Sequence, residues 1–196
     1  MLRLPPPQKN TTLLFKAVLA FLLVSIIGIF LYNGVYQRKS ALLIESSPVA
    51  KVYIDGNEKG MTPLELVIDK EEVILHLVAK GIPLPPWGAK IKLTEGVKTI
   101  VRRNFGESEG LDSSQIISYR KNFSGNAEIS VVSVPDEADL YLDNQLLGTS
   151  PLRVDTLEGK HILRVEKEGY KDEIAEIIAI QNYTVTLIFE LARAID

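Results

Sequence analysis

Histidine and cysteine, two of the side chains most often used in acid–base, nucleophilic and metal chemistry, are scarce or absent in this sequence. The chain has two histidines and no cysteine, so thiolate metal sites, a cysteine nucleophile and disulfides are excluded. His76 stands between two leucines, His161 opens an alternating run, and neither has a second histidine nearby. A zinc site needs several ligands close together. We therefore expect structural or surface roles for both histidines, and we expect no metal and no cofactor.

The carboxylates are numerous, but their pattern suggests turns rather than catalysis. Asp55 and Asp143 recur in equivalent places, followed by Gly56 and Asn144. A calcium site would need more oxygen ligands than this spacing provides, and no phosphate-binding loop or nucleophile elbow is present. Asp-Gly and Asp-Asn suit the positive φ angles of a tight hairpin turn. We predict no catalytic residue and no enzymatic activity. The residues predicted to shape turns are Asp55, Gly56, Gly60, Pro63, Asp143, Asn144, Gly148 and Pro151.

The single tryptophan, Trp87, stands in the proline-rich segment Pro83–Gly88. A stiff loop that presents an aromatic ring could stack on a sugar or anchor a protein partner. Alternatively, the ring covers the edge of its own domain or packs on a neighbouring one. Both interpretations stay open, and Trp87 is the one candidate contact for a protein or glycan partner.

An internal repeat supplies the elements that position these residues. The segments Ala50–Ile82 and Ala138–Tyr170 align without a gap and share nine identities, which include both turn aspartates. Each copy contains short alternating runs rich in β-forming residues, separated by glycine and proline. The sequence therefore predicts an all-β fold with two tandem small β-sandwich domains.

The expected boundaries follow from composition. The two domains are predicted over residues 41–103 and 127–192, and the polar, Gly/Ser-rich segment 104–126 is predicted as a linker. Within that linker, Gln115–Tyr119 is too apolar for pure linker and is expected to pack against a domain.

The second copy resembles a known family. The residues that carry the resemblance are Pro135-Asp136-Glu137-Ala138-Asp139-Leu140-Tyr141-Leu142-Asp143, then Gly148-Thr149-Ser150-Pro151-Leu152, then Gly159 with His161, and Lys167-Glu168-Gly169-Tyr170. Over residues 127–192 they are similar to the PEGA domain, and residues 41–103 resemble a divergent copy. Neither copy keeps the glycine of the family's name. The resemblance implies a β-sandwich module associated with surfaces, envelopes or receptors, and it implies no known catalytic residue.

An uncharged run precedes the repeat, from Ala17 to Gln37. As a helix it would rise about 31 Å, which matches the hydrocarbon core of a bilayer. A cleaved signal peptide would have a shorter apolar core and a small-residue cleavage site. A buried core helix is disfavoured because the run is uniformly apolar and a β-type pattern with no helix partner follows it. We therefore predict a single transmembrane α-helix over residues 13–37, bound to the lipid bilayer, after a short cytoplasmic tail over residues 1–12.

Charge bears on orientation and on partners. The charged residues before Arg38 are all basic, namely Arg3, Lys9 and Lys16, so the rest of the chain is more acidic than the overall net charge of −3. An acidic folded part argues against binding nucleic acid. The positive-inside rule slightly favours a cytoplasmic N-terminus with the β domains outside the membrane.

The sequence thus predicts a non-catalytic, single-pass protein of the cell membrane that displays two β-sandwich interaction or scaffold modules at the cell envelope. The alternatives are a tether that binds cell-wall or surface glycan, and an accessory subunit of a membrane complex. Coplanar exposed aromatic rings would favour the first alternative, and a large apolar surface patch would favour the second.

Overall fold

The computed structural model describes residues 16, 18–28, 39–81, 83–108 and 110–195. The chain divides into two units, 1–37 and 38–196. Residues 18–28 are helical. Within the described residues, no helix has both the length and the apolar character needed to cross a membrane. The predicted tail over 1–12 and much of the predicted anchor over 13–37 lie outside the described residues.

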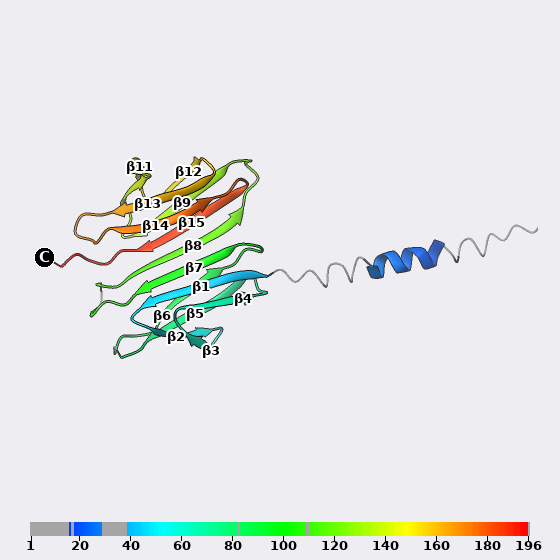
Figure 1. Cartoon of the computed structure of the whole chain (residues 1–196), viewed down its shortest axis with the longest axis horizontal. Coiled ribbons are helices and arrows are strands. Elements are labelled where there is room, and N and C mark those ends of the chain that lie inside the picture. The colour runs from blue at the N-terminus through cyan, green and yellow to red at the C-terminus, as the bar shows by residue number, and fades with distance from the viewer. Residues whose placement is uncertain (1–15, 17, 29–38, 82, 109, 196) are drawn as a thin grey trace, which may run out of the picture. The chain divides into compact units, whose positions relative to one another are not determined.

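The second unit consists of β-strands (Figure 1). The strands are β1 (Ser40–Ser47), β2 (Ala50–Ile54), β3 (Asn57–Met61), β4 (Leu64–Ile68), β5 (Glu72–Ala79), β6 (Trp87–Lys92), β7 (Lys98–Asn104), β8 (Ser113–Lys121), β9 (Ala127–Val134), β10 (Asp139–Leu142), β11 (Gln145–Thr149), β12 (Leu152–Thr156), β13 (Gly159–Glu166), β14 (Glu173–Ala179) and β15 (Tyr183–Glu190). The predicted all-β class is confirmed for this unit.

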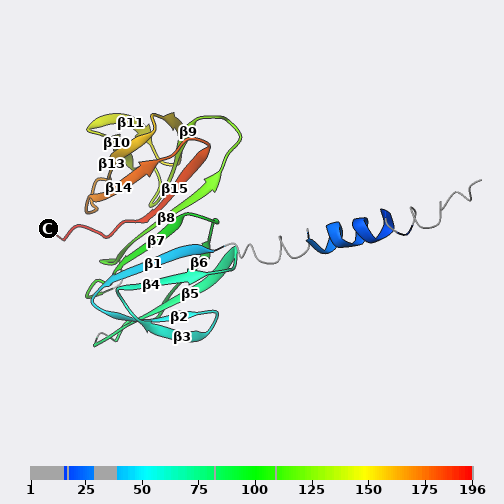
Figure 2. The ribbon, with the colours of Figure 1, turned by 45° about the vertical axis from the view of Figure 1, so that its right-hand side comes forward.

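One sheet runs through both halves of the repeat. It has seven strands in the order β12-β9-β15-β8-β7-β1-β4, and two four-stranded sheets, β3-β2-β5-β6 and β11-β10-β13-β14, accompany it. Figure 2 shows the two smaller sheets toward opposite edges of the large one. The prediction of two separate sandwiches therefore needs correction, because the halves share a hydrogen-bonded sheet.

The connection is made by β8, which occupies residues 113–121 of the predicted linker over 104–126. It pairs antiparallel with β7 on one side and with β15 on the other. Its side chains alternate: Ile117 is 1% exposed within the core of the second half, and Ile116 packs against the core of the first. A flexible linker would bury neither residue, so the prediction is corrected here to a central strand.

The two cores lie on opposite faces of the seven-stranded sheet. Val101 and Ile116 are paired neighbours and belong to the first core, whereas Ile100 and Ile117 are the adjacent pair and belong to the second. Since successive residues of a strand point to opposite faces, each four-stranded sheet covers its own half of the large sheet from its own side.

The pairing is symmetric about β8. Moving outward, β7 is followed by parallel β1 and antiparallel β4, and β15 is followed by parallel β9 and antiparallel β12. A twofold rotation about an axis along β8 exchanges these sets and also exchanges the faces of the sheet. The repeat therefore folds into two similar halves related by an approximate twofold axis, and each half leaves one face of its three large-sheet strands uncovered.

Candidate functional site

The predicted turn residues occupy equivalent positions in the two halves. Asp55 and Gly56 have φ angles of 51° and 79°, and Asp143 and Asn144 have 50° and 68°. These values fit the positive φ angles of a two-residue hairpin turn. Each aspartate also reaches across its sheet: Asp55 Oδ1 accepts the Ile74 N–H, and Asp143 Oδ1 accepts the Ile162 N–H, both at 2.9 Å. The aspartates thus tie the hairpin to the next strand.

The same aspartates each hold one basic side chain. Asp143 Oδ2 lies 2.7 Å from His161 Nδ1, and Asp55 Oδ2 lies 2.6 Å from Lys70 Nζ. The hydrogen bond from the Ile162 N–H, together with His161, lowers the pKa of Asp143. Burial lowers the pKa of His161, but hydrogen bonds to Asp143 and to the Leu157 carbonyl outweigh it, so that pKa is raised. These contacts fix the side chains of both pairs at the hairpin turns.

The glycines at the end of the hairpins have backbone angles that other residues rarely adopt. The φ angle is 144° at Gly60 and 141° at Gly148. In each hairpin the pairing register shifts next to the residue pair that contains the glycine. Pro63 and Pro151 follow each glycine three residues later and precede β4 and β12. The chain leaves one sheet and enters another at these prolines.

Substitution of Gly148 by valine should therefore destabilise the protein. We expect Gly148→Val to cost about 2 kcal/mol of unfolding free energy, above the ~1 kcal/mol of simple propensity, because φ of 141° is strained for a branched residue. Chemical denaturation measures the loss. Leu146→Val, on the same strand and 61% exposed, is the control and should change stability by less than about 0.5 kcal/mol. Equal effects of both variants would contradict the prediction.

Trp87 lies at the junction of the two halves. The residue is half-buried against the first core, and its indole Nε1 donates to Glu190 Oε2 on β15 at 3.2 Å. Glu190 Oε2 also accepts from Arg103 Nη1 at 2.6 Å and from the Ser114 hydroxyl at 2.8 Å. The contact of Trp87 with the neighbouring copy, one of the two interpretations above, is therefore present, and the indole N–H is already used.

Arg103 is the centre of this junction. Its side chain is 7% exposed and lies between the rings of Trp87 and Phe105, at 5.3 and 5.4 Å from their centroids. Asp112 provides a second carboxylate partner. Burial lowers the pKa of Arg103, and the Glu190 carboxylate counteracts that shift. A buried arginine held by two acids is a positioning element of the fold, not a reactive group.

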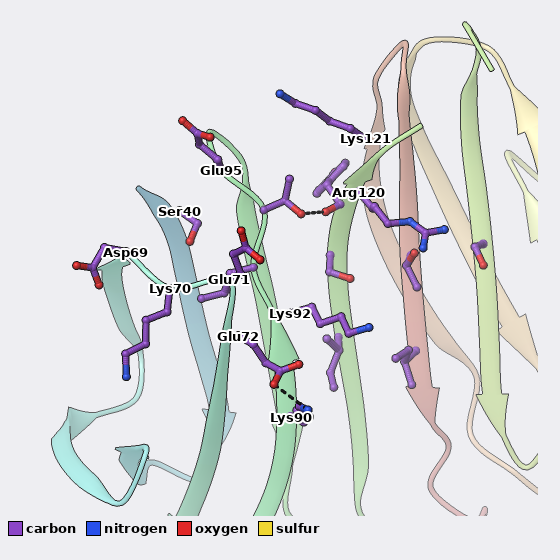
Figure 3. Close-up of a pocket in the computed structure, with 18 residues that line it drawn as sticks. Ser40, Asp69, Lys70, Glu71, Glu72, Lys90, Lys92, Glu95, Arg120 and Lys121 are labelled. Carbon is purple, nitrogen blue, oxygen red and sulfur yellow. Dashed lines mark hydrogen bonds and ion pairs between the residues drawn. The ribbon is translucent and has the colours of Figure 1, made fainter. Parts of the chain in front are cut away.

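An open groove of about 1210 Å³ lies on the uncovered face of the second half (Figure 3). Its floor is formed by side chains of β8, β9 and β15 that point away from the second core. Its wall is formed by β6 and by the loops that flank β5 and β6. The floor residues are Ile116, Ser118, Ser130, Thr186 and Ile188, and the charged residues are Asp69, Lys70, Glu71, Glu72, Lys90, Lys92, Glu95, Arg120 and Lys121.

Several charges of the groove are already paired. Lys90 Nζ lies 2.8 Å from Glu72, and Lys70 is held by Asp55. Lys92, Arg120 and Lys121 are exposed, and no described residue forms a side-chain hydrogen bond or ion pair with any of them. Figure 3 shows Lys92 extending from β6 toward β8. The groove therefore combines an apolar and hydroxyl-bearing floor with three available cations at its sides.

The backbone of β6 adds a second binding feature. This strand pairs only with β5, so the edge facing the groove has no strand partner among the described residues. An extended peptide can add to such an edge by main-chain hydrogen bonds. The equivalent edge strand of the second half, β14, is more closed: Gln115 Nε2 donates to the Ile174 carbonyl and to Glu173, and the adjacent pocket measures about 400 Å³.

The groove and the junction hold few groups that could ligate a metal. No cluster of three or more potential metal-ligating side chains occurs in the part of the chain that the structure describes. Sequence reasoning did not find the groove, because its floor and its wall come from strands far apart in the chain. The alternation Ile116, Ser118, Arg120 in β8 is the one local signal, since it marks a strand with a partly polar face.

Comparison with known proteins bears on the second half. None of the curated proteins compared with the chain matches it. The resemblance predicted for residues 127–192 is confirmed, because residues 126–195 match the model of the PEGA domain.

Proposed function

We propose that the protein is a non-catalytic, membrane-anchored envelope protein whose two halves act as one rigid scaffold for a protein partner. In this proposal the first half is a divergent PEGA-like module, and residues 13–37 anchor the chain in the bilayer. The N-terminus is cytoplasmic, and the β unit lies outside the membrane.

The internal symmetry supports two related modules. The strand order, the pairing directions and the turn aspartates repeat from one half to the other. A hydroxyl pair also repeats: Ser46 and Thr62 are 2.6 Å apart, Ser133 and Ser150 are 2.5 Å apart, and the second member of each pair accepts the N–H of Ala50 or Ala138. These are the features expected of a duplicated module whose first copy has diverged in sequence.

The groove is the observation that carries the proposed function. It offers an unpaired strand edge, an apolar strip and available cations over a length that an extended segment can follow. Val132 and Val134 continue the uncovered face, 40% and 58% exposed. Main-chain pairing gives affinity and alternate side chains give specificity in this mode of recognition. An extended protein segment with acidic side chains fits this chemistry.

A glycan tether remains the alternative function, and the position of the aromatic residues favours it less. Sugar binding uses aromatic faces as stacking platforms. Tyr119, the aromatic residue of the groove lining, packs against the second core, and burial raises its pKa. Trp87 is half-buried and bonded to Glu190. The mixed charges of the groove and the unpaired edge of β6 suit a protein partner better than a glycan.

Site-specific photocrosslinking in native membranes tests the proposal. A photoreactive residue placed at Ser118 or at Ile188 should give the same discrete, protease-sensitive adduct, and one placed at Val67, which is 69% exposed on β4, should not. Double charge reversal, Lys92→Glu with Arg120→Glu, should reduce the adduct about tenfold. Lys171→Glu, outside the groove, is the control.

Two results would contradict this proposal. An adduct of equal yield from Val67 would show that the groove is not the contact surface. A protease-resistant adduct that reacts as carbohydrate would replace the protein partner with a glycan.

A further inference from the structure

The two most exposed large apolar side chains of the described residues are Phe123 and Leu157, with relative exposures of 103% and 81%. Phe123 stands in the turn between β8 and β9, and Leu157 follows β12. A fully exposed phenylalanine on a turn contributes nothing to either core. Exposed apolar surface gathered at one end of a molecule marks a contact with a partner or a membrane.

Both side chains lie at the end of the large sheet where the chain enters it. Strand β1 begins at Ser40, β7 runs parallel to it, and β8 runs antiparallel to β7, so β8 ends at that same end. Strand β9 starts from there and β12 returns to it. In Figure 1 the start of β1 and the arrowhead of β8 lie at the same, right-hand end of the sheet.

The turns that carry these side chains are held by hydrogen bonds. The Asn122 N–H donates to the Asn182 carbonyl at 2.8 Å, and Asn126 Nδ2 donates to Asp155 at 2.8 Å. His161 Nε2 lies 2.8 Å from the Leu157 carbonyl. The two apolar side chains are thus carried at the same end of the sheet by turns that hydrogen bonds hold in place.

The charges around these turns suit a lipid surface. Arg120, Lys121 and Lys160 are exposed there, and no described residue pairs with their side chains. Of the acids near these turns, Asp155 is held by Asn126 and Glu158 is exposed. Asp69, Glu71 and Glu95 line the groove beside Lys121, on the side of the first half. Basic residues beside an apolar side chain favour the interface of an anionic membrane.

We propose that Phe123 and Leu157 insert into the interfacial region of the same bilayer that anchors the chain, with Lys121 and Lys160 contacting anionic headgroups. This inference rests on the anchor of the proposed function. A membrane is the favoured occupant because the uncharged run ends at Gln37, three residues before Ser40, so this end of the sheet is tethered close to the bilayer. The insertion would fix the orientation of the groove, whose mouth includes Lys121 and Glu95.

Depth-dependent fluorescence quenching in the full chain tests the insertion. The chain has no cysteine, so Ser124→Cys places a single polarity-sensitive label beside Phe123, and Asp136→Cys places one on the turn after β9, at the other end of the sheet. Both proteins are reconstituted into phosphatidylcholine–phosphatidylglycerol vesicles that contain spin-labelled lipid. We expect several-fold stronger quenching at position 124 than at position 136. Adding Phe123→Ser to the Ser124→Cys chain should remove most of that difference.

The outcomes separate the two proposals. Vesicle flotation under alkaline carbonate reports the anchor independently of the label. A chain that floats but is quenched equally at both positions refutes the insertion and leaves the anchor intact. A chain that is released by carbonate refutes the anchor and, with it, the insertion. Unchanged quenching after Phe123→Ser would show that the apolar side chain is not what brings this turn to the lipid.

Discussion

A fragment that begins at residue 113 is expected to unfold cooperatively, whereas a fragment that begins at residue 127 should lack a stable fold. The difference is β8. It pairs with β15 over eight residue pairs, from Tyr183 with Lys121 to Glu190 with Ser114. Without it, β15 becomes an open edge and the second core loses Ile117, which is 1% exposed. Truncation of a buried isoleucine alone costs about 2–5 kcal/mol, a large share of the stability of so small a domain.

Circular dichroism melts of fragments 113–196 and 127–196 measure this effect. In the full chain, Ile117→Ala should lower the unfolding free energy by about 3 kcal/mol. Ile188→Ala is the matched control: the residue lies on neighbouring β15, is 38% exposed and points to the groove, so it should cost less than about 1 kcal/mol. If fragment 127–196 melts as sharply as fragment 113–196, the second half folds without β8, and β8 serves only to connect the two halves.

Local features of this fold could be predicted from the sequence. The hairpin turns follow from Asp55-Gly56 and Asp143-Asn144, because few residues tolerate positive φ. Alternation such as that of His161–Glu166 marks a half-buried strand without any knowledge of its partner. Composition and periodicity predict each strand separately. The repeat then predicts that the chain contains two similar sets of strands.

The pairing across the halves could not be predicted in this way. The Gly/Ser-rich stretch before Ser113 suggests a linker, and a single isolated strand gives no periodic context to outweigh it. Whether Ile116 and Ile117 serve one core or two depends on which strands flank them. Trp87 is a similar case, because its contact with Glu190 joins residues 103 positions apart. The groove is a product of these long-range pairings.

Arg103, at the junction, should contribute much more to the free energy of unfolding than Arg102, its neighbour on the same strand. Arg103 points into the first core and is 7% exposed, and Arg102 points to the other face, where it pairs with Glu45 at 2.9 Å with both side chains 40% exposed. Loss of one partner of a buried pair costs about 3–5 kcal/mol, and the 45% exposure of Glu190 reduces this figure because water can solvate that carboxylate. We expect Arg103→Ala to cost about 2–3 kcal/mol, and we expect less than about 1 kcal/mol for Arg102→Ala.

The single tryptophan reports the same junction. Trp87 stacks with Arg103 and donates to Glu190, so Arg103→Ala should shift its fluorescence emission before any unfolding, while Arg102→Ala should not. Glu190→Gln keeps an acceptor for the indole and for Ser114 but removes the charge that balances Arg103, and it should cost about 1–2 kcal/mol. Urea denaturation followed by tryptophan fluorescence measures the emission shift and the free energy together. Equal losses for Arg102→Ala and Arg103→Ala would mean that the halves are held by the β7–β8–β15 backbone pairing alone.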